Sequence, residues 1–141
     1  MIIQQLSVFI ENKSGRLYEV MQTLGDAGIN VSALSIADTS DYGIARLIVT
    51  EPKKAMALLK EQEFSVQMTP VICCKLEDKP GELKRMLAAL TEDNISLEYM
   101  YAFSKGEDAL IILRTEDCEH TIASLAKHNL EIMKAADIYL I

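Results

Sequence analysis

The chain has 141 residues, of which 50% are apolar and 25% charged, and its formal net charge is −7. This composition is typical of a folded, water-soluble protein, and an acidic chain without a lysine and arginine cluster lacks the charge that binds nucleic acid or anionic lipid. The longest apolar runs are about five residues, whereas a membrane-spanning helix needs about 20.

The cysteine content and the first residues favour a reducing, cytoplasmic environment. The three cysteines, Cys73, Cys74 and Cys118, are an odd number. Adjacent strand residues face opposite sides of a sheet, so Cys73 and Cys74 are expected to be buried thiols rather than a disulfide. Residues 1–5 contain no basic side chain and are typical of a strand rather than of a signal peptide.

The first half of the chain predicts the element order β-α-β-β-α-β. Residues 2–10 alternate as in a strand, and apolar residues at helical spacing follow Ser14, the expected N-cap. Gly28 is expected to end this helix in the left-handed conformation. The elements that follow are strands at 30–37 and 44–49, a helix that starts at Pro52, and a strand at 64–68.

The second half repeats this order. Its expected strands lie at about 71–76, 95–103, 109–114 and 131–141, and its helices at about 80–92 and 117–128. We therefore predict an α+β protein of two ferredoxin-like βαββαβ copies, residues 1–69 and 70–141. Each copy is expected to have an antiparallel sheet with its helices on one face. Pro70 alone interrupts the strands that join the copies, so a rigid connection is expected.

A short polar turn occurs in both copies. Residues 12–17, Asn-Lys-Ser-Gly-Arg-Leu, return at 78–83 as Asp-Lys-Pro-Gly-Glu-Leu. The register continues with Gly-Ile-Asn-Val at 28–31 against Asn-Ile-Ser-Leu at 94–97 and, after a slip of one residue, Thr50-Glu51 against Thr115-Glu116. The chain is therefore one unit used twice. Folding requires the core positions in both copies, so the repeated turn is the part expected to carry function.

This turn has the chemistry of an amino-acid site. Gly15 allows another group to approach closely, and the unpaired N–H groups of a helix N-terminus suit a carboxylate. Asn12 ends the first strand and Asn30 begins the second, which is expected to lie beside it at the same sheet end. An amide can donate to a carboxylate and accept from an ammonium group, so two amides suit a zwitterion. On the residues alone, an ordinary capped turn with Asn30 in a helix exit is the alternative.

An aromatic row in the second copy predicts packing against another sheet. Leu97, Tyr99, Tyr101 and Phe103 alternate along one strand and therefore share a face. If both helices cover one face of the sheet, the other face needs cover, and aromatic side chains suit such an interface. Core or interface is favoured here over a ligand site.

The remaining reactive side chains predict neither catalysis nor a metal site. His120 and His128 are eight residues apart on the last helix, too far for a compact metal site, and are expected on its solvated face. The cysteines have no Cys-x-x-Cys spacing and no paired histidine. Acidic residues at 116–119 suit the start of a helix. No glycine-rich phosphate loop is present, so no catalytic residue, metal or cofactor is predicted.

The repeated turns, each with the four-residue stretch that follows, resemble the signature of ACT domains over essentially the whole chain. The second turn, Asp-Lys-Pro-Gly-Glu-Leu, is the closer of the two to the family's Asp-x-Pro-Gly-x-Leu. ACT domains are regulatory modules that bind amino acids or other small ligands between paired domains, usually on enzymes of amino-acid metabolism. The resemblance implies ligand contacts at Asn12, Ser14, Gly15, Arg16, Leu17, Asn30, Val31, Asp78, Pro80, Gly81, Glu82, Leu83, Ser96 and Leu97.

The second copy departs from the family's serine-binding pattern, which uses two amides. Asn12 and Asn30 provide both amides in the first copy, whereas Asp78 and Ser96 stand at these places in the second. The second site is then altered, contacts a different end of the ligand, or is purely structural.

The resemblance implies a free-standing tandem ACT protein that is not an enzyme. Its expected form is a cytoplasmic homodimer that binds a free amino acid and regulates an enzyme of amino-acid metabolism through ligand-dependent pairing. One alternative is a ligand-free dimerisation or docking module for such an enzyme. A remote alternative is an acylphosphatase-like hydrolase, for which Arg16 and Asn30 are the candidate anion-binding and water-orienting groups.

Overall fold

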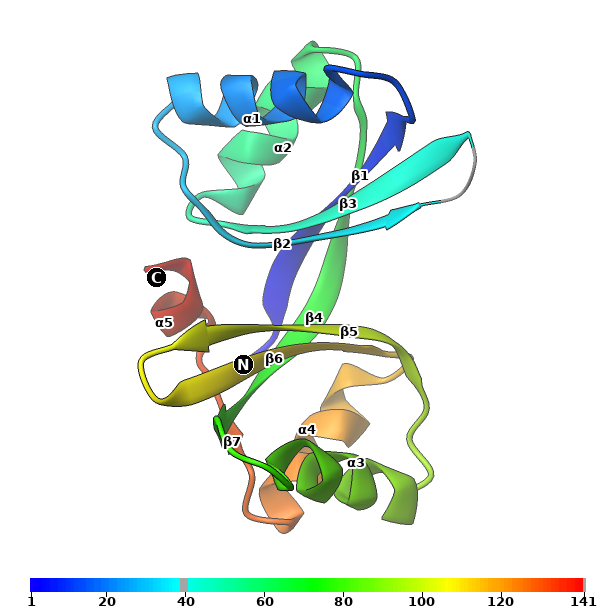
Figure 1. The fold of residues 1–141 in the computed structure, drawn as a ribbon, viewed down its shortest axis with the longest axis vertical. Coiled ribbons are helices and arrows are strands. Elements are labelled where there is room, and N and C mark those ends of the chain that lie inside the picture. Colours follow the sequence, from blue (N-terminus) through cyan, green and yellow to red (C-terminus); the bar gives the residue numbers. More distant parts are fainter. Residues whose placement is uncertain (39–40, 141) are drawn as a thin grey trace. The chain divides into compact units, whose positions relative to one another are not determined.

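The structure is a computed structural model that describes residues 1–38 and 41–140. The chain forms two compact units (Figure 1). The first module consists of Gln4–Thr69 and of the C-terminal segment that starts at Ala136, and the second module of Pro70–Ala135 and Met1–Ile3. Each module is therefore completed by a short segment from the other end of the sequence.

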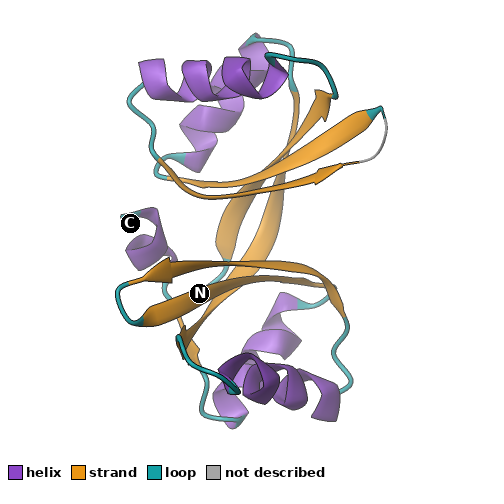
Figure 2. Ribbon diagram, viewed as in Figure 1, coloured by secondary structure: helices purple, strands orange, loops and turns teal. Residues whose placement is uncertain are grey.

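The sheet of the first module has the strand order β2-β3-β1-β4. It consists of β1 (Ile3–Glu11), β2 (Val31–Asp38), β3 (Tyr42–Val49) and the first part of β4 (Ser65–Glu77), with the helices α1 (Arg16–Asp26) and α2 (Pro52–Glu61). β3 is antiparallel to both β1 and β2, so β1 and β2 are parallel to each other. The two helices lie on one face of this sheet (Figure 2).

The second module repeats this plan with the order β7-β4-β6-β5. It consists of the last part of β4, α3 (Glu82–Glu92), β5 (Leu97–Lys105), β6 (Asp108–Thr115), α4 (Cys118–Lys127) and β7 (Glu131–Ile132). Its strand pairs are antiparallel. The predicted α+β fold of two ferredoxin-like βαββαβ units is confirmed.

Alternation along the strands places one hydrophobic core in each module. Leu6 of β1 pairs with Leu47 of β3 and packs with Leu24 of α1, and all three side chains are fully buried. Ile72 of β4 and Leu113 of β6 are the equivalent pair in the second module and are also fully buried. Burial of each such side chain stabilises the fold by about 1.5–3 kcal/mol.

Helices α1 to α4 end in the same way, on a residue with positive φ. At the end of α1, Ile29 N–H donates to the Leu24 carbonyl at 2.9 Å and Gly28 N–H donates to the Gly25 carbonyl at 3.0 Å. These two bonds form the Schellman pattern, which satisfies the last carbonyls of a helix. The residues in the left-handed conformation are Gly28, Glu63, Asn94 and Asn129. The prediction for Gly28 is confirmed.

The start of α1 differs from the prediction, because Ser14 is not its N-cap. Gly15 takes that position with a φ of 88°, and no side chain caps the helix. Gly81 precedes α3 with a φ of 91° in the same way. The left-handed glycine turns the chain so tightly that Arg16 N–H reaches the Lys13 carbonyl at 3.3 Å. A backbone turn therefore replaces the expected hydroxyl cap.

Two strands expected at 64–68 and 71–76 form one continuous strand, the 13-residue β4. Pro70 lies inside it and brings no N–H donor, but its fixed φ is compatible with an extended strand. The Pro70 carbonyl accepts a hydrogen bond from Arg114 Nη1 of β6 at 2.9 Å.

The strand expected at 131–141 is wrong beyond Ile132. β7 has two residues, and the short helix α5 (Ala135–Tyr139) follows it. Two consecutive alanines at its start favour a helix. Ile138 is fully buried, and the Tyr139 hydroxyl accepts a hydrogen bond from Gln4 N–H at 2.8 Å. The apolar residues after 131 therefore pack from a helix and not from a strand.

The aromatic row forms on β5 as predicted. Tyr99, Tyr101 and Phe103 lie opposite Arg114, Ile112 and Leu110 of β6. All three aromatic side chains are half-buried within the chain. Their role in a homodimer stays a prediction. Among the described residues, no helix is long and apolar enough to cross a membrane.

Candidate functional site

The turn between β1 and α1 is closed by backbone hydrogen bonds. Asn12 N–H donates to the Asp41 carbonyl at 3.1 Å, and Lys13 N–H donates to the Glu11 carbonyl at 2.7 Å. Within the described residues, the N–H groups of Ser14, Gly15 and Leu17 have no hydrogen-bond acceptor. A Cβ built on Gly15 would meet nothing within 4 Å, so space does not require a glycine here. The positive φ of this residue does, and the absence of a side chain leaves the turn open.

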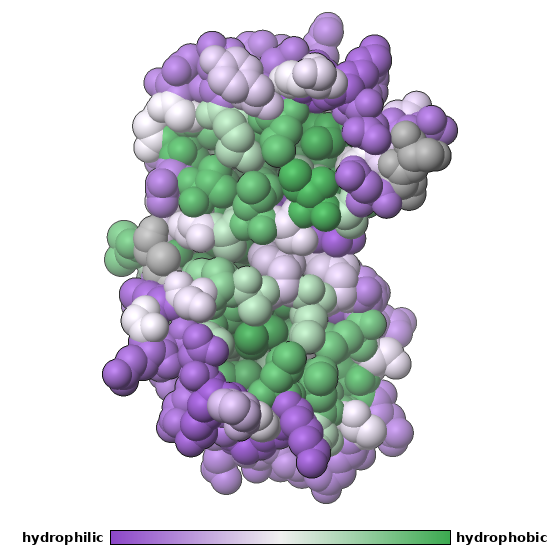
Figure 3. All heavy atoms as spheres, in the orientation of Figure 1, coloured by the Kyte–Doolittle hydropathy of each residue, from purple (hydrophilic) through white to green (hydrophobic). Residues whose placement is uncertain are grey.

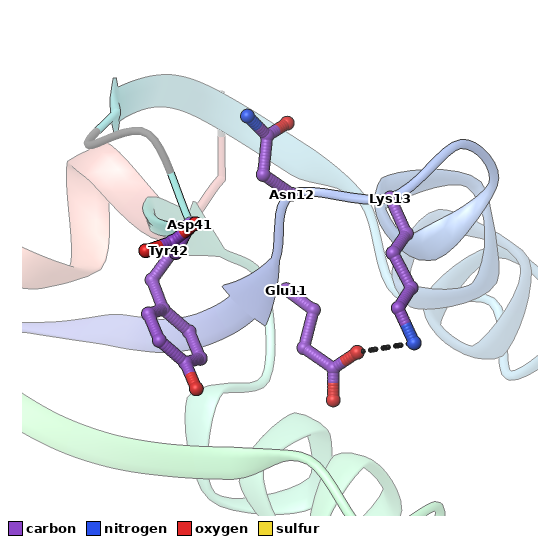
Figure 4. Close-up of a pocket in the computed structure, with 5 residues that line it drawn as sticks. All are labelled: Glu11, Asn12, Lys13, Asp41 and Tyr42. Carbon is purple, nitrogen blue, oxygen red and sulfur yellow. Dashed lines mark ion pairs between the residues drawn. The ribbon is translucent and has the colours of Figure 1, made fainter.

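A shallow hollow of about 400 Å³ lies beside this turn (Figure 4). It is lined by Glu11, Asn12, Lys13, Asp41 and Tyr42. Lys13 Nζ lies 2.8 Å from a Glu11 carboxylate oxygen, and this hydrogen bond lowers the pKa of Glu11. Asn12 is exposed, and its side chain points away from the Glu11–Lys13 pair. The hollow therefore presents amide and charged groups that small polar ligands use.

The second module has the same hollow at the equivalent place. It measures about 520 Å³ and is lined by Glu77, Asp78, Lys79, Glu107 and Asp108. Asp78 N–H donates to the Glu107 carbonyl at 3.0 Å, as Asn12 does to Asp41. Lys79 Nζ lies 2.7 Å from Glu77, and this hydrogen bond raises the pKa of Lys79. The backbone of the turn repeats, while the hollow of the second module is the more acidic one.

The first helical residue has opposite charge in the two modules. Arg16 pairs with Glu19 at 2.6 Å, and its guanidinium lies over the Phe64 ring with 4.4 Å to the centroid. Glu82 takes this position in the second module and pairs with Arg85 at 2.8 Å, which lowers the pKa of Glu82. In the second module the positive side chain is Arg85, one helical turn after the first helical residue. The N-terminus of α3 therefore carries a carboxylate where that of α1 carries a guanidinium.

Asn30 lies at the opposite end of the sheet from Asn12. Its N–H donates to Thr50 Oγ1 at 3.1 Å, and its carbonyl accepts from Thr50 N–H at 3.1 Å. Thr50 follows β3, whereas Asp41, the neighbour of Asn12, precedes it. The eight residues of β3 rise about 3.4 Å each, so roughly 27 Å separate the two positions.

The expectation that Asn12 and Asn30 are neighbours in one module is therefore wrong. The reason is the direction of the strands: β1 and β2 are parallel, so the end of one and the start of the other lie at opposite sheet ends. Arg16 and Asn30 are separated for the same reason. One module does not bring together the two groups that an acylphosphatase-like site would need.

We call the sheet end that carries the polar turn the turn end of each module, and the other end the Asn30 end or the Ser96 end. The residues implied by the ACT resemblance divide between these ends. Asn12, Ser14, Gly15, Arg16 and Leu17 lie at the turn end of the first module, and Asn30 and Val31 at its Asn30 end. Asp78, Pro80, Gly81, Glu82 and Leu83 lie at the turn end of the second module, and Ser96 and Leu97 at its Ser96 end.

The Ser96 end contains a small hollow of about 140 Å³. Asp117 is the N-cap of α4 there and accepts a hydrogen bond from His120 N–H at 3.1 Å. The lining residues are Asn94, Ile95, Ser96, Thr115, Glu116, Asp117 and His120. Sequence reasoning assigned no binding role to the residues that follow β6. The sequence feature that could have located them is the repeat of Thr50-Glu51 as Thr115-Glu116, because it marks the ends of β3 and β6.

The cysteines and histidines form no reactive site among the residues that the structure describes. Burial raises the pKa of Cys73 and of Cys74 to about 12, so both are inert thiols. His120 is exposed as predicted, but His128 is half-buried, with Nε2 3.4 Å from Asp93. The expected solvated face is wrong for His128. Within residues 1–38 and 41–140, no group of three or more His, Cys, Asp or Glu side chains could hold a metal ion.

Comparison with known proteins gives the same architecture. Residues 1–141 match the family described as ACT domain pair. The crystal structure of protein BT0572 from Bacteroides thetaiotaomicron is 38% identical, with a TM-score of 0.96, over 100% of this chain and 98% of that one. No match is found among curated protein sequences.

Two aspartate kinase regulatory subunits share the fold at low identity. The subunit from Thermus thermophilus, in its ligand-free form, is 15% identical with a TM-score of 0.65, over 90% of this chain and 93% of that one. The subunit from Thermus flavus is 16% identical with a TM-score of 0.61, over 89% and 92%. The repeated turns, the two βαββαβ modules and the match over the whole sequence lead to one conclusion: the chain belongs to the family of ACT domain pairs.

Proposed function

We propose that this chain is a regulatory protein that binds a free amino acid between paired modules and works as a homodimer. The observation that carries the proposal is the separation of Asn12 from Asn30 by the length of β3. A small zwitterion does not bridge that distance inside one module. A complete site therefore needs the turn end of one module beside the Asn30 end of another.

The two ends have complementary chemistry for an amino acid. The N–H groups at Ser14, Gly15 and Leu17 and the positive end of α1 suit the α-carboxylate. The amides of Asn12 and Asn30 can accept from the ammonium group and donate to the carboxylate. Side-chain selection would then come from the module that provides the second half.

The edge of the first module supports such pairing. β2 is the outer strand of its sheet, and its Leu34 and Ile36 are 46% and 42% exposed. An outer strand with exposed apolar side chains is a template for another strand. Figure 3 shows apolar residues gathered between α1 and β2, below a polar rim over α1.

Pairing of two β2 strands about a twofold axis would assemble the divided site. Two strands related in this way run antiparallel. Because β1 is parallel to β2, the Asn30 end of one copy then lies next to the turn end of the other. The twofold axis would create two equivalent sites. An amino acid bound there would stabilise the pair, and a regulated enzyme of amino-acid metabolism would respond to that change.

Thermal unfolding with each of the twenty L-amino acids tests the proposal. An amino acid at 100 times its Kd should stabilise the protein by about 2.7 kcal/mol. Asn30→Ala should reduce this effect, whereas Ser35→Ala, on the same strand but away from its start, should not. If no amino acid raises the unfolding temperature of the wild-type protein, the proposal fails and a ligand-free docking module becomes the better explanation.

A further inference from the structure

The C-terminal helix α5 is attached to the first module by few contacts. Ile138 is fully buried, and the Tyr139 hydroxyl accepts the hydrogen bond of Gln4 N–H at 2.8 Å. Of the other residues, Ala135 is half-buried, Ala136 and Asp137 are exposed, and Leu140 is 85% exposed. One fully buried apolar side chain, the half-buried Tyr139 ring and one hydrogen bond therefore fasten the segment.

Tyr139 binds at the Asn30 end of the first module. β1 pairs with β3 from Leu6, which lies opposite Leu47, so Gln4 stands level with Val49 when the same register is continued. Val49 is also the partner of Val31, the residue that follows Asn30. The Tyr139 hydroxyl thus contacts the start of β1 at the same sheet end as Asn30.

The docked state of α5 is expected to be marginal. A helix of five residues does not form stably by itself in water. Ordering such a segment costs backbone and side-chain entropy, which offsets the gain from the buried Ile138 side chain, the half-buried Tyr139 ring and the hydrogen bond. Docked and released states of α5 should therefore both be populated while the two hydrophobic cores stay folded.

We propose that α5 is a reversible strap whose docking on Gln4 is coupled to ligand binding at the Asn30 end. The coupling rests on the amino-acid site proposed above, whereas the strap itself does not. A bound ligand fixes the start of β2, and the docked strap fixes the start of β1 at the same sheet end. Each event lowers the entropy that the other must lose, so the coupling is positive and reciprocal.

Hydrogen exchange of individual amides by NMR on the full chain tests the strap. In the wild-type protein, the amides of Gln4 and of residues 138–140 should exchange faster than core amides such as that of Leu47. Tyr139→Phe removes the acceptor and should accelerate exchange at Gln4 by about three- to tenfold, with the Leu47 amide unchanged. Tyr18→Phe is the matched control, because Tyr18 lies on α1 with 68% exposure and should change neither amide.

Two results would overturn the strap. In the first, the Gln4 amide exchanges at the same rate as the core amides, which would make α5 an integral part of the fold. In the second, Tyr139→Phe leaves the exchange rate of the Gln4 amide unchanged, which would show that the contact with the Tyr139 hydroxyl does not protect the start of β1.

The coupling has its own measurement. The amino acid that raises the unfolding temperature most, at millimolar concentration, should slow exchange of residues 138–140, and Tyr139→Phe should weaken its binding by the same factor. Binding without an effect on the tail would refute the coupling and leave the amino-acid site intact. If no amino acid binds, the proposed site and the coupling fail together. The strap is then tested by the exchange rate of the Gln4 amide alone.

Discussion

Asn12 and Asn30 stand at opposite ends of β3, the first beside Asp41 and the second beside Thr50. In the proposed amino-acid site, the two amides therefore belong to two half-sites. The same division holds in the second module, where Asp78 lies beside Glu107 and Ser96 lies in the hollow next to Thr115. In the function proposed above, pairing of modules is then a requirement for a complete site and not only a way to bury surface.

The first prediction compares the two half-sites that follow the first helix of each module. Asn30→Ala removes an amide with both donor and acceptor capacity, which should cost about 1–3 kcal/mol, or roughly five- to 150-fold in amino-acid affinity. Ser96→Ala removes a single hydroxyl and should cost clearly less. Titration calorimetry on both variants gives the comparison, and a larger loss for Ser96→Ala would place the main site on the second module.

The second prediction concerns the reading of the ligand carboxylate. The turn end offers N–H donors at a helix N-terminus, so replacing the α-carboxylate of the bound amino acid by its amide should weaken binding by about 1.5–3 kcal/mol. Competition between the acid and its amide for the same protein measures the difference. Equal affinities would show that the turn does not contact the carboxylate.

The third prediction uses two glycines three residues apart. Gly28 has a φ of 74° at the end of α1, whereas Gly25 lies inside the helix, and an added Cβ would meet nothing within 4 Å at either position. Gly28→Ala should destabilise the fold by about 1–2 kcal/mol through backbone strain alone. Gly25→Ala should stabilise it by up to about 1 kcal/mol through helix propensity. Urea unfolding measures both, and effects of the same sign would contradict the Schellman ending.

The fourth prediction concerns acid stability in the second module. Hydrogen bonds from Ser124 Oγ at 2.5 Å and Lys127 Nζ at 2.9 Å connect Asp93 at the end of α3 to α4 and lower its pKa from 3.8 to about 2. A carboxyl whose pKa is lower in the folded state stabilises the fold above pH 3.8, and this contribution is lost as the pH falls towards 2.

Asp93→Asn isolates this contribution. The variant should lose less stability than the wild-type protein between pH 5 and about pH 2, measured as the shift of the urea midpoint. Asp26→Asn is the control, because Asp26 is exposed near the end of α1. If Asp93→Asn and the wild-type protein respond equally to acid, the link between α3 and α4 does not depend on the charge of Asp93.

The element order and the repeated turn could be read from the sequence because both rest on local patterns. Alternation in β1, helical spacing in α1 and the glycine at residue 28 each specify a local backbone conformation. The same local signals failed where a longer-range contact decides. Residues 133–140 carry apolar side chains that suit a strand or a short helix, and packing on the first module selects the helix.

The candidate site shows the same limit more sharply. The residue types at Asn12 and Asn30 were visible, and so were the different residues, Asp78 and Ser96, at the equivalent places of the second copy. Their separation depends on the parallel direction of β1 and β2, which is a property of sheet topology and not of either residue. Thr115 and Asp117, at the end of β6, line the same hollow as Ser96 because the sheet topology places that strand end beside the start of β5.

Binding by mixed dimers tests the divided site most directly. We expect the Asn12→Ala and Asn30→Ala variants each to bind the amino acid weakly alone. When the two are mixed and allowed to exchange subunits, roughly half of the dimers contain both variants, and one of their two sites has both amides. Calorimetry should then recover roughly a quarter of the wild-type number of tight sites. No recovery from this mixture, together with tight binding by dimers of the wild-type chain and the Asn12→Ala/Asn30→Ala double variant, would place both amides in one subunit and contradict the account.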